Sequence, residues 1–327
     1  MGYCPATMKH LLSAAVLICA SACGSSSPAP SAPEPTPASS PEPAAPTDPA
    51  PAGDPDATPE PDAPEAKPEE LALIALPAPP LERFMADGVS EPSGRAPKLV
   101  QVSVKRNQIT DDERWFAENQ LTNPISYFPR DDPATPRLRG VPLSLRIEGD
   151  PTLWLFGTYN LFDSFLVATE PGDDDSVRFA FDLSDYSPVP ATAELETEAL
   201  NMQLAWAVVD GDRLYLCHDH GTYSDSSDGV NAFLTAVSIP DGELLWRSRP
   251  LVSNARNFAL VEAGGRKLLV AGYGFTDEPD FLHLIDPDSG AVLAKTKLRK
   301  GATYILPKDD KLYVRTYDRD YVFRIKP

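Results

Sequence analysis

Gly211-Asp212-Arg213-Leu214-Tyr215-Leu216 is the stretch that decides the fold. It consists of a polar turn, a basic residue and an apolar run. The same pattern returns as Gly-Arg-Lys-Leu-Leu-Val at 265–270 and as Asp-Asp-Lys-Leu-Tyr-Val at 309–314, with a looser copy at 149–155. Recurrence in a fixed order, at a spacing of tens of residues, is typical of stacked or circular repeat architectures. The apolar runs are expected to be core rather than active site.

Each copy belongs to a unit of four short apolar segments joined by turns rich in Asp and Gly. The segments before the copies are Leu143–Ile147, Ala205–Val209, Phe258–Glu262 and Thr303–Leu306. Third segments open at Phe165, Phe233, Phe281 and Tyr321, and fourth segments are Val177–Phe181, Glu243–Arg247 and Ala291–Lys297. Four antiparallel strands per unit predict an all-β fold, a β-propeller over residues 141–327. About four blades are expected, with one further blade within 96–140 as the alternative.

The last unit lacks its fourth strand, because the sequence reaches Pro327 directly after the third. A propeller closes its ring by pairing strands from distant parts of the chain, since an open edge invites aggregation. Residues 98–105 alternate apolar and polar side chains, as a strand does. We therefore expect Leu99–Val104 to pair with Tyr321–Ile325 and complete the last blade.

Residues 83–140 are predicted to hold that strand, a short helix and a surface excursion. A capping box at Thr110-Asp111-Asp112-Glu113 predicts the start of the helix. Trp115, Phe116 and Leu121 would form its apolar side. Residues 122–140 are rich in turn formers, which favours a path over the surface.

The first 22 residues read as an export signal. Lys9 and His10 precede an apolar run from Leu11 to Ile18, which is too short to span a bilayer. Met8 is an alternative start to Met1. Ala20-Ser21-Ala22-Cys23 resembles the lipobox of bacterial lipoproteins, although that family more often has Leu at the position of Ala20. The resemblance implies lipidation of Cys23, and Gly24 after it implies the outer membrane; an ordinary secretory signal cut after Ala22 is the alternative.

Residues 23–82 are predicted to be the lipidated cysteine and a disordered linker. Of the 36 prolines in the chain, half lie between Pro28 and Pro80. Few large apolar residues occur before Leu71, so little burial offsets the chain entropy. Such a segment favours extended conformers and acts as a spacer. The apolar residues from Leu71 to Leu81 are expected to be the first to touch the domain.

Composition argues against two kinds of partner, nucleic acid and anionic lipid, and against internal disulfide bonds. The net charge is −19, and Lys and Arg are scattered along the sequence, so neither nucleic acid nor anionic lipid is an expected partner. Cys4 and Cys19 fall in the signal and Cys23 would carry lipid, which leaves Cys217 without an internal disulfide partner. Stability must therefore come from burial.

Residues 238–247, Ser-Ile-Pro-Asp-Gly-Glu-Leu-Leu-Trp-Arg, resemble the repeat of PQQ-like (quinoprotein-type) propellers, in which Asp, a Thr-Gly turn and Trp recur. Residues 286–294 match in their turn but have Ala294 in place of Trp, and the first unit keeps neither feature. Enzymes of that family need a quinone platform and a calcium site. This chain is short for such a ring and lacks an adjacent cysteine pair, so no cofactor is expected. The resemblance extends, in anchor and fold, to the propeller lipoproteins of the outer-membrane barrel assembly machine, which are scaffolds.

Two local clusters are candidate ion sites. Cys217-His218-Asp219-His220 places His218 and His220 on one face of a strand, where His283 of the next unit would add a third imidazole for zinc or copper. The alternative is that these polar groups satisfy loop backbone by hydrogen bonds. The loop 223–229, with Asp225 and Asp228, has oxygen ligands in a calcium-like arrangement, as do the acids at 173–175. Neither has the full order of a calcium loop, which favours solvated turns, with calcium sites as the alternative. Three tryptophans, Trp154, Trp206 and Trp246, are expected in the core.

No nucleophile triad, phosphate loop or carboxylate pair was found that would predict an enzyme. The sequence therefore predicts a non-catalytic envelope lipoprotein of the outer membrane, facing the periplasm or the outside, whose propeller binds a protein partner. The alternative is a ligand or metal receptor that uses His218 and His220.

Overall fold

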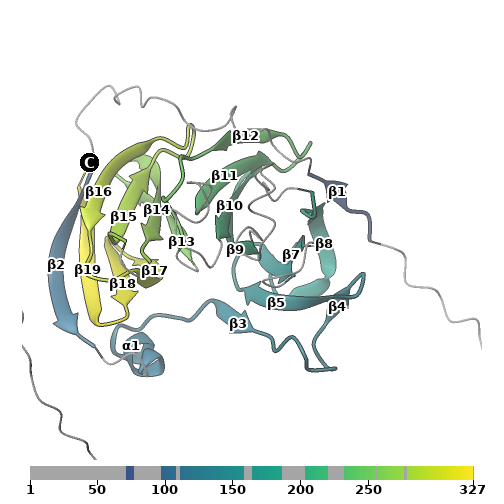
Figure 1. Ribbon diagram of the computed structural model, residues 1–327, viewed down its shortest axis with the longest axis horizontal. Helices are drawn as coiled ribbons and strands as arrows, with labels where there is room; N and C mark the ends of the chain where they lie inside the picture. The colour runs from purple at the N-terminus through teal and green to yellow at the C-terminus, as the bar shows by residue number, and fades with distance from the viewer. Residues whose placement is uncertain are drawn as a thin grey trace, which may run out of the picture. The chain divides into compact units, whose positions relative to one another are not determined.

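The computed structural model describes residues 71–76, 97–107, 111–157, 164–185, 203–219, 232–254, 257–275 and 278–326. These residues form four sheets, each built on a run of four antiparallel strands, and one helix of seven residues. The sheets are the blades of a β-propeller, as the repeats predicted (Figure 1). Within the described ranges there is no helix long and apolar enough to cross a membrane.

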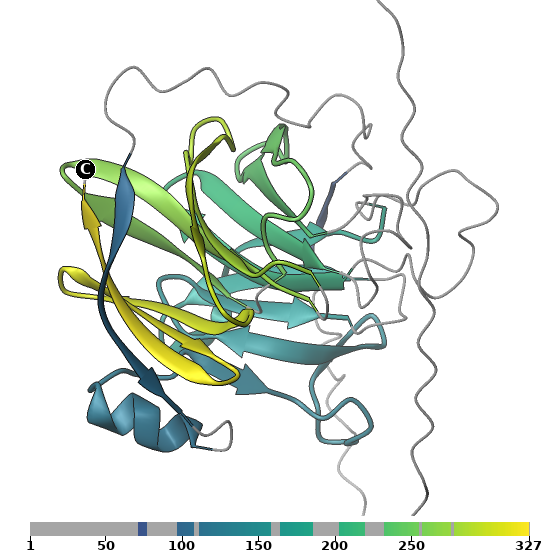
Figure 2. The same ribbon diagram turned by 60° about the vertical axis from the view of Figure 1, so that its left-hand side comes forward.

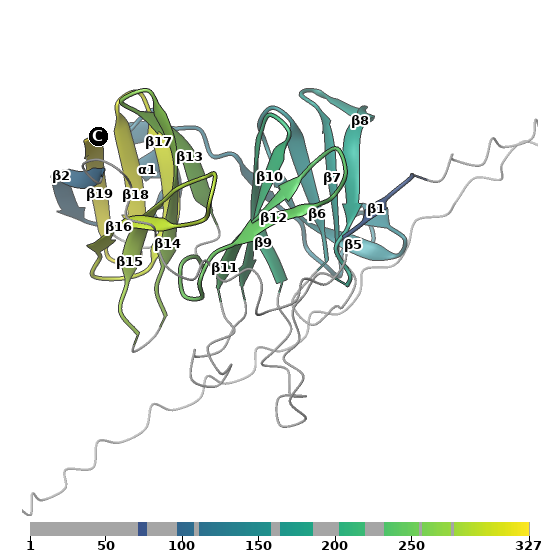
Figure 3. The ribbon, with the colours of Figure 1, turned by 90° about the horizontal axis from the view of Figure 1, so that it is seen from above.

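The blades follow one another along the chain. Blade 1 comprises β5 (Val141–Ile147), β6 (Thr152–Phe156), β7 (Phe165–Glu170) and β8 (Asp173–Asp182); blade 2 comprises β9 (Gln203–Asp210), β10 (Arg213–Asp219), β11 (Phe233–Ser238) and β12 (Leu244–Arg247). Blade 3 comprises β13 (Phe258–Ala263), β14 (Arg266–Tyr273), β15 (Phe281–Ile285) and β16 (Val292–Lys297), and blade 4 comprises β17 (Ala302–Lys308), β18 (Lys311–Thr316), β19 (Arg319–Lys326) and β2 (Lys98–Arg106). Seen from above, blades 1 and 2 lie beside each other, as do blades 3 and 4 (Figure 3). The recurring stretch forms the second strand of every blade.

Blade 4 is completed by the strand that the open edge predicted. β2 runs antiparallel to β19, with Val104 opposite Tyr321 and Leu99 opposite Ile325 (Figure 2). A bulge at Val322 and Phe323 shifts the register between these two pairs. The expected pairing is therefore confirmed, and within the described residues 97–140 no fifth blade is present.

The core lies between the blades, and the second strands are among its most buried parts. Leu214, Tyr215 and Leu216 of β10 are all fully buried. A strand covered on both faces reads as a continuous apolar run rather than as an alternation, which explains the Leu-Tyr-Leu pattern. Trp206 and Trp246 are buried as expected, whereas Trp154 is half-buried under the guanidinium of Arg146.

A tryptophan and a glycine turn join blade 2 to blade 3. The turn between β15 and β16 ends at Gly290, whose φ of 71° lies in the left-handed region. The ring of Trp246 packs against this glycine, and its Nε1 donates to the carbonyl oxygen of Pro287 at 3.0 Å. The Asp-to-Gly turn of one blade and the tryptophan of the preceding blade thus form one contact.

Blade 1 makes the corresponding contact without a tryptophan. β1 (Ile74–Ala75) pairs in parallel with β8, placing Ile74 opposite Phe181. An added Cβ on Gly242, in the β11–β12 turn, would lie 2.9 Å from the Leu76 side chain, which is 2% exposed. Residues 74–76 therefore pack against the turn at Gly242, where a tryptophan like Trp246 would otherwise lie. The predicted linker, residues 23–82, thus includes residues that belong to blade 1.

Helix α1 (Asp112–Glu118) is part of the core rather than of a surface excursion. Trp115 and Phe116 are buried and pack on Tyr304 of β17, with ring centroids 5.8 and 5.2 Å from its own. The N-cap is Asp111, whose side chain makes no capping bond, and Thr110, with which the predicted capping box begins, lies outside the described residues.

The segment after α1 is tied to blade 1 by a short strand. β3 (Ile125–Tyr127) pairs with β5, and Ile125 is buried. β4 (Arg137–Leu138) adds to the other end of β5. Residues 112–138 therefore connect blade 4 with blade 1, although most of the side chains from 129 to 140 are exposed, as a surface path predicts.

Candidate functional site

The described residues include only part of the predicted ion sites. Cys23, His220, Asp225 and Asp228 lie outside them, so the lipidation site, the His218–His220 pair and the calcium loop stay predictions. No cluster of three or more His, Cys, Asp or Glu side chains that would hold a metal ion occurs among the residues that the structure describes.

His218 lies near the end of β10, an inner strand of blade 2. It is 2% exposed on β10, between Leu204 of β9 and Phe233 of β11. Burial, and next the positive charge of Arg247, lower the pKa of His218 to about 3. The imidazole is consequently neutral at physiological pH.

His283 lies on the third strand of blade 3, opposite Ala271 of β14. It is 3% exposed on β15, and its Nδ1 lies 3.0 Å from the carbonyl oxygen of Val252. Burial lowers the pKa of His283 to about 4, while the contact with Val252 opposes this shift. Because a carbonyl only accepts, the neutral ring carries its proton on Nδ1 and leaves Nε2 as an acceptor.

The buried imidazole of His283 predicts a loss of stability in mild acid. The unfolded chain takes up a proton near pH 6.5, but the folded chain does so only near pH 4. Stability is therefore present above pH 6.5 and falls as the pH is lowered, by ~2 kcal/mol between pH 6.5 and 5 for one such group. Urea unfolding at pH 7.5 and 5.0 should show a smaller difference for His283→Gln than for the parent chain. Equal differences would contradict the buried neutral imidazole.

Cys217 is a structural thiol. It is fully buried beside His218, and its Sγ lies 3.2 Å from the Ser253 hydroxyl. Burial raises the pKa of the Cys217 thiol well above its ordinary value. A thiol without thiolate character is a weak nucleophile, so this residue is suited to packing rather than to catalysis.

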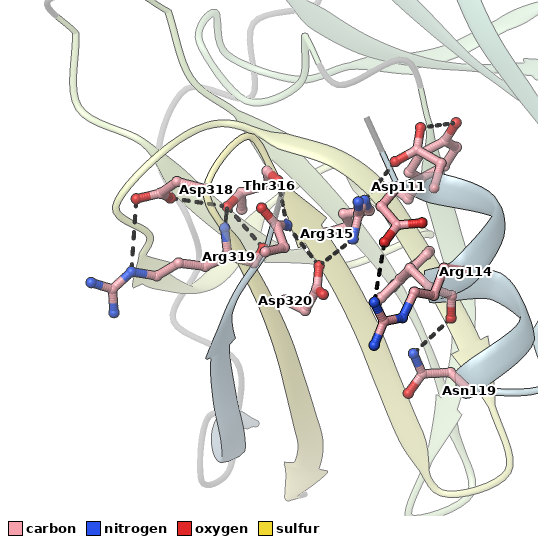
Figure 4. Close-up of polar contacts among 12 residues, drawn as sticks. Asp111, Arg114, Asn119, Arg315, Thr316, Asp318, Arg319 and Asp320 are labelled. Atoms are coloured by element: carbon pink, nitrogen blue, oxygen red, sulfur yellow. Dashed lines mark hydrogen bonds and ion pairs between the residues drawn. The ribbon is translucent and has the colours of Figure 1, made fainter. Parts of the chain in front are cut away.

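A buried arginine organises the polar contacts between blade 4 and α1. Arg315 of β18 is 3% exposed, and its Nε donates to Asp112 at 2.6 Å while one Nη donates to Asp320 at 2.8 Å. Figure 4 shows Arg315 between β19 and the first turn of α1. Asn107 donates to the same oxygen of Asp320 at 2.8 Å, which links the end of β2 to the cluster.

Aromatic rings close this cluster from one side. The guanidinium carbon of Arg315 lies 5.6 Å from the centroid of Trp115, within the range of a cation–π contact. The Tyr304 hydroxyl donates to the second oxygen of Asp112 at 3.3 Å. Burial raises the pKa of Tyr304 to about 12, so the hydroxyl stays protonated and able to donate.

Among the cavities that border blade 4, two are lined by several charged residues. One, of about 690 Å³, opens beside the Arg315 cluster between the end of β2 and α1. The other, of about 870 Å³, lies where the β14–β15 and β16–β17 connections meet. It is lined by charges of both signs, which are Glu278, Asp280, Lys297, Arg299 and Lys300. Mixed lining of this kind favours polar peptide groups over one simple ion.

Strand pairing collects positive charge on one face of blade 4. Residues opposite each other in neighbouring strands share a face, and Arg315 is opposite Tyr304 on β17 and Asp320 on β19, which is in turn opposite Lys105 on β2. The seven cationic residues of this face, which we call the basic face, are Lys98, Lys105, Lys308, Lys311, Arg315, Arg324 and Lys326. Asp320 is its single acidic residue in these four strands.

The even scatter of Lys and Arg expected from the sequence is wrong at this face. Residues 295–326 contain ten Lys and Arg against four Asp, in a chain of net charge −19. A local count of charges would have found the signal, whereas the total charge conceals it. Register then adds Lys98 and Lys105 from more than two hundred residues earlier.

Comparison with known proteins gives distant likenesses in structure alone. The crystal structure of BamB from Moraxella catarrhalis is 12% identical, with a TM-score of 0.28, over 54% of this chain and 56% of that chain. The C-terminal domain of Bacillus megaterium YpeB is 9% identical, with a TM-score of 0.12, over 61% of this chain and 99% of that domain. The match thus spans about half the length of BamB. No protein-family model and no curated protein matches the sequence.

Proposed function

We propose that this chain is an exported envelope lipoprotein, anchored through Cys23, whose propeller is a non-catalytic scaffold for a protein partner. The signal and lipobox-like sequence at 1–23 support export and anchoring. The Pro-rich segment that follows would give the propeller reach from the membrane. In this proposal the blades provide a rigid frame, and the partner protein binds one exposed surface of it.

The observation that carries the proposal is the apolar character of an exposed edge. Val100, Val102 and Val104 of β2 are 36%, 50% and 38% exposed. β2 is the outermost strand of blade 4 and is nine residues long, whereas the outermost strand of blade 2 has four. A long edge with exposed apolar side chains is the kind of surface that another polypeptide covers.

A photo-crosslinking residue at position 102 of the full-length chain tests this function in cells. We expect a discrete covalent adduct with an envelope protein, identified by mass spectrometry. The matched control is the same residue at position 245, because Leu245 is 40% exposed on the short strand β12 and should give no adduct. A chain that gives no adduct at position 102, or equal adducts at both, would refute the scaffold function at this edge.

A further inference from the structure

The basic face of blade 4 is divided into a covered and an open half. α1 covers the half around Arg315. At the other end of the same strands, Lys98, Val100, Arg324 and Lys326 are exposed and Lys311 is half-exposed. We call these five residues the open half of the basic face. They form one surface because Lys326 is opposite Lys98 and Arg324 is opposite Val100.

The covered half shows which chemistry the face accepts. Residues 111–118 contain four acidic side chains and a single arginine, with Trp115 and Phe116 turned to the blade. Asp112 pairs with Arg315, and Trp115 packs on the guanidinium and on Tyr304. Lys308 of β17 lies opposite Lys311 and donates to the carbonyls of Asn119 and Gln120 at 3.0 and 2.9 Å, so the end of the helix follows β17 to the border of the open half. An acidic, aromatic segment is thus already bound to one half.

The open half repeats these features without a described element over them. It has four cations around an exposed valine, and β2 ends the sheet among the described residues. The ion pair of Arg324 with Asp310, at 2.8 Å, leaves both side chains more than half exposed. Such a pair contributes little and exchanges readily for a better-placed acid.

We propose that the open half binds an acidic, aromatic-bearing segment of a partner protein, in the way the covered half binds α1. The inference rests on the scaffold function proposed above and names its partner's chemistry. A second copy is a poorer occupant through its own β2, because antiparallel pairing centred on Val102 would place Lys98 opposite Arg106. The exposed Val100 among these cations favours a polypeptide over a purely ionic ligand.

The test uses a fluorescein-labelled peptide of residues 111–121 and the full-length chain, with binding followed by anisotropy. We expect saturable binding at low salt that weakens as salt is raised, since the contacts are largely ionic. Lys311→Glu, Arg324→Glu and Lys326→Glu together should weaken binding at least tenfold. The matched control is Arg130→Glu, Arg249→Glu and Lys300→Glu, which makes the same change in net charge at exposed sites elsewhere and should leave binding unchanged.

Each outcome decides the proposal. An equal loss of peptide affinity in both triple variants would show a general charge effect and would overturn the proposal. Failure of the parent chain to bind the peptide would also overturn it. A peptide with Asn and Gln in place of its acids that binds equally well also overturns it. So does binding to anionic phospholipid vesicles, lost in the first triple variant, without binding to the peptide. If the crosslink at position 102 forms but the peptide does not bind, the scaffold function stands and the acidic chemistry is wrong; if neither is seen, both fail.

Discussion

Replacing Gly290 with alanine is expected to lower the free energy of unfolding by about 2–5 kcal/mol. The residue has a φ of 71°, which is unfavourable for any L side chain. The new Cβ would also lie 2.8 Å from Cδ2 of Trp246, inside the contact distance. Backbone strain and overpacking therefore add at one position. Urea denaturation followed by circular dichroism would measure the loss.

Gly265 provides the matched control. Its φ of 74° is nearly the same, but a Cβ there would meet no atom within 4 Å. Gly265→Ala should therefore cost only the backbone strain, about 1–2 kcal/mol. In a Trp246→Ala background the cost of Gly290→Ala should fall to the same level, because the clash is gone. If the losses from Gly290→Ala and Trp246→Ala simply add in the double variant, the clash with the Trp246 ring is not what makes Gly290 necessary.

Arg315→Met is expected to cost about 3–5 kcal/mol, the second large effect. Asp112 and Asp320 would lose the guanidinium that they share, and Trp115 would lose its cation. The guanidinium is buried while Asp112 and Asp320 are 40% and 21% exposed, so water would replace only part of the charge-assisted hydrogen bonds that they lose. The same denaturation measurement applies, and near-ultraviolet circular dichroism should report loosening around Trp115.

Arg324→Met is the control for this change, because it removes an arginine of the same blade from an exposed pair. Its side chain and that of Asp310 are 52% and 65% exposed, so the loss should stay below about 1 kcal/mol. Similar losses for the two variants would mean that burial of Arg315 does not determine the strength of its contacts. Asp112→Asn should fall between them, since an amide still accepts one hydrogen bond.

The blades could be predicted from the sequence because each is a local object. A turn and an apolar run recur in order, and strand pairing within a blade joins neighbours in the chain. Closure by residues 98–105 followed from counting strands in the last unit. The sequence did not predict the contacts that take the place of a missing tryptophan. Leu76, for example, packs against Gly242 in the way that Trp246 packs against Gly290. A two-residue strand carries no periodic signal of its own.

The interpretation of the histidines rested on alternation along one strand. Alternation correctly separates two faces, but it does not tell whether a face is solvent or core. β10 has strands on both sides and blades on both faces, so His218 is buried and neutral. Nothing tests His220, which lies outside the described residues.

The partners of Asp112 and of the basic face required the fold. Asp112 and Arg315 are 203 residues apart, and Lys98 faces Lys326 only because the ring closes. Pairings at such separation leave no local pattern in a sequence. The excess of Lys and Arg after residue 294 can be counted in the sequence. It supports the proposed acidic partner only because the strand register places those cations on one face.

The β2–β19 pairing also has a consequence for how the chain is made. β2 leaves the ribosome early, while the one strand that pairs with it among the described residues is β19, at residues 319–326. Contacts of such long range are formed late and slowly, because a large loop must be ordered first. Until then the backbone edges of β2 and β19 are unpaired and open to other chains and to proteases. A chain that stops before residue 319 leaves β2 without this partner strand, so blade 4 is complete only after residues 319–326 have been made.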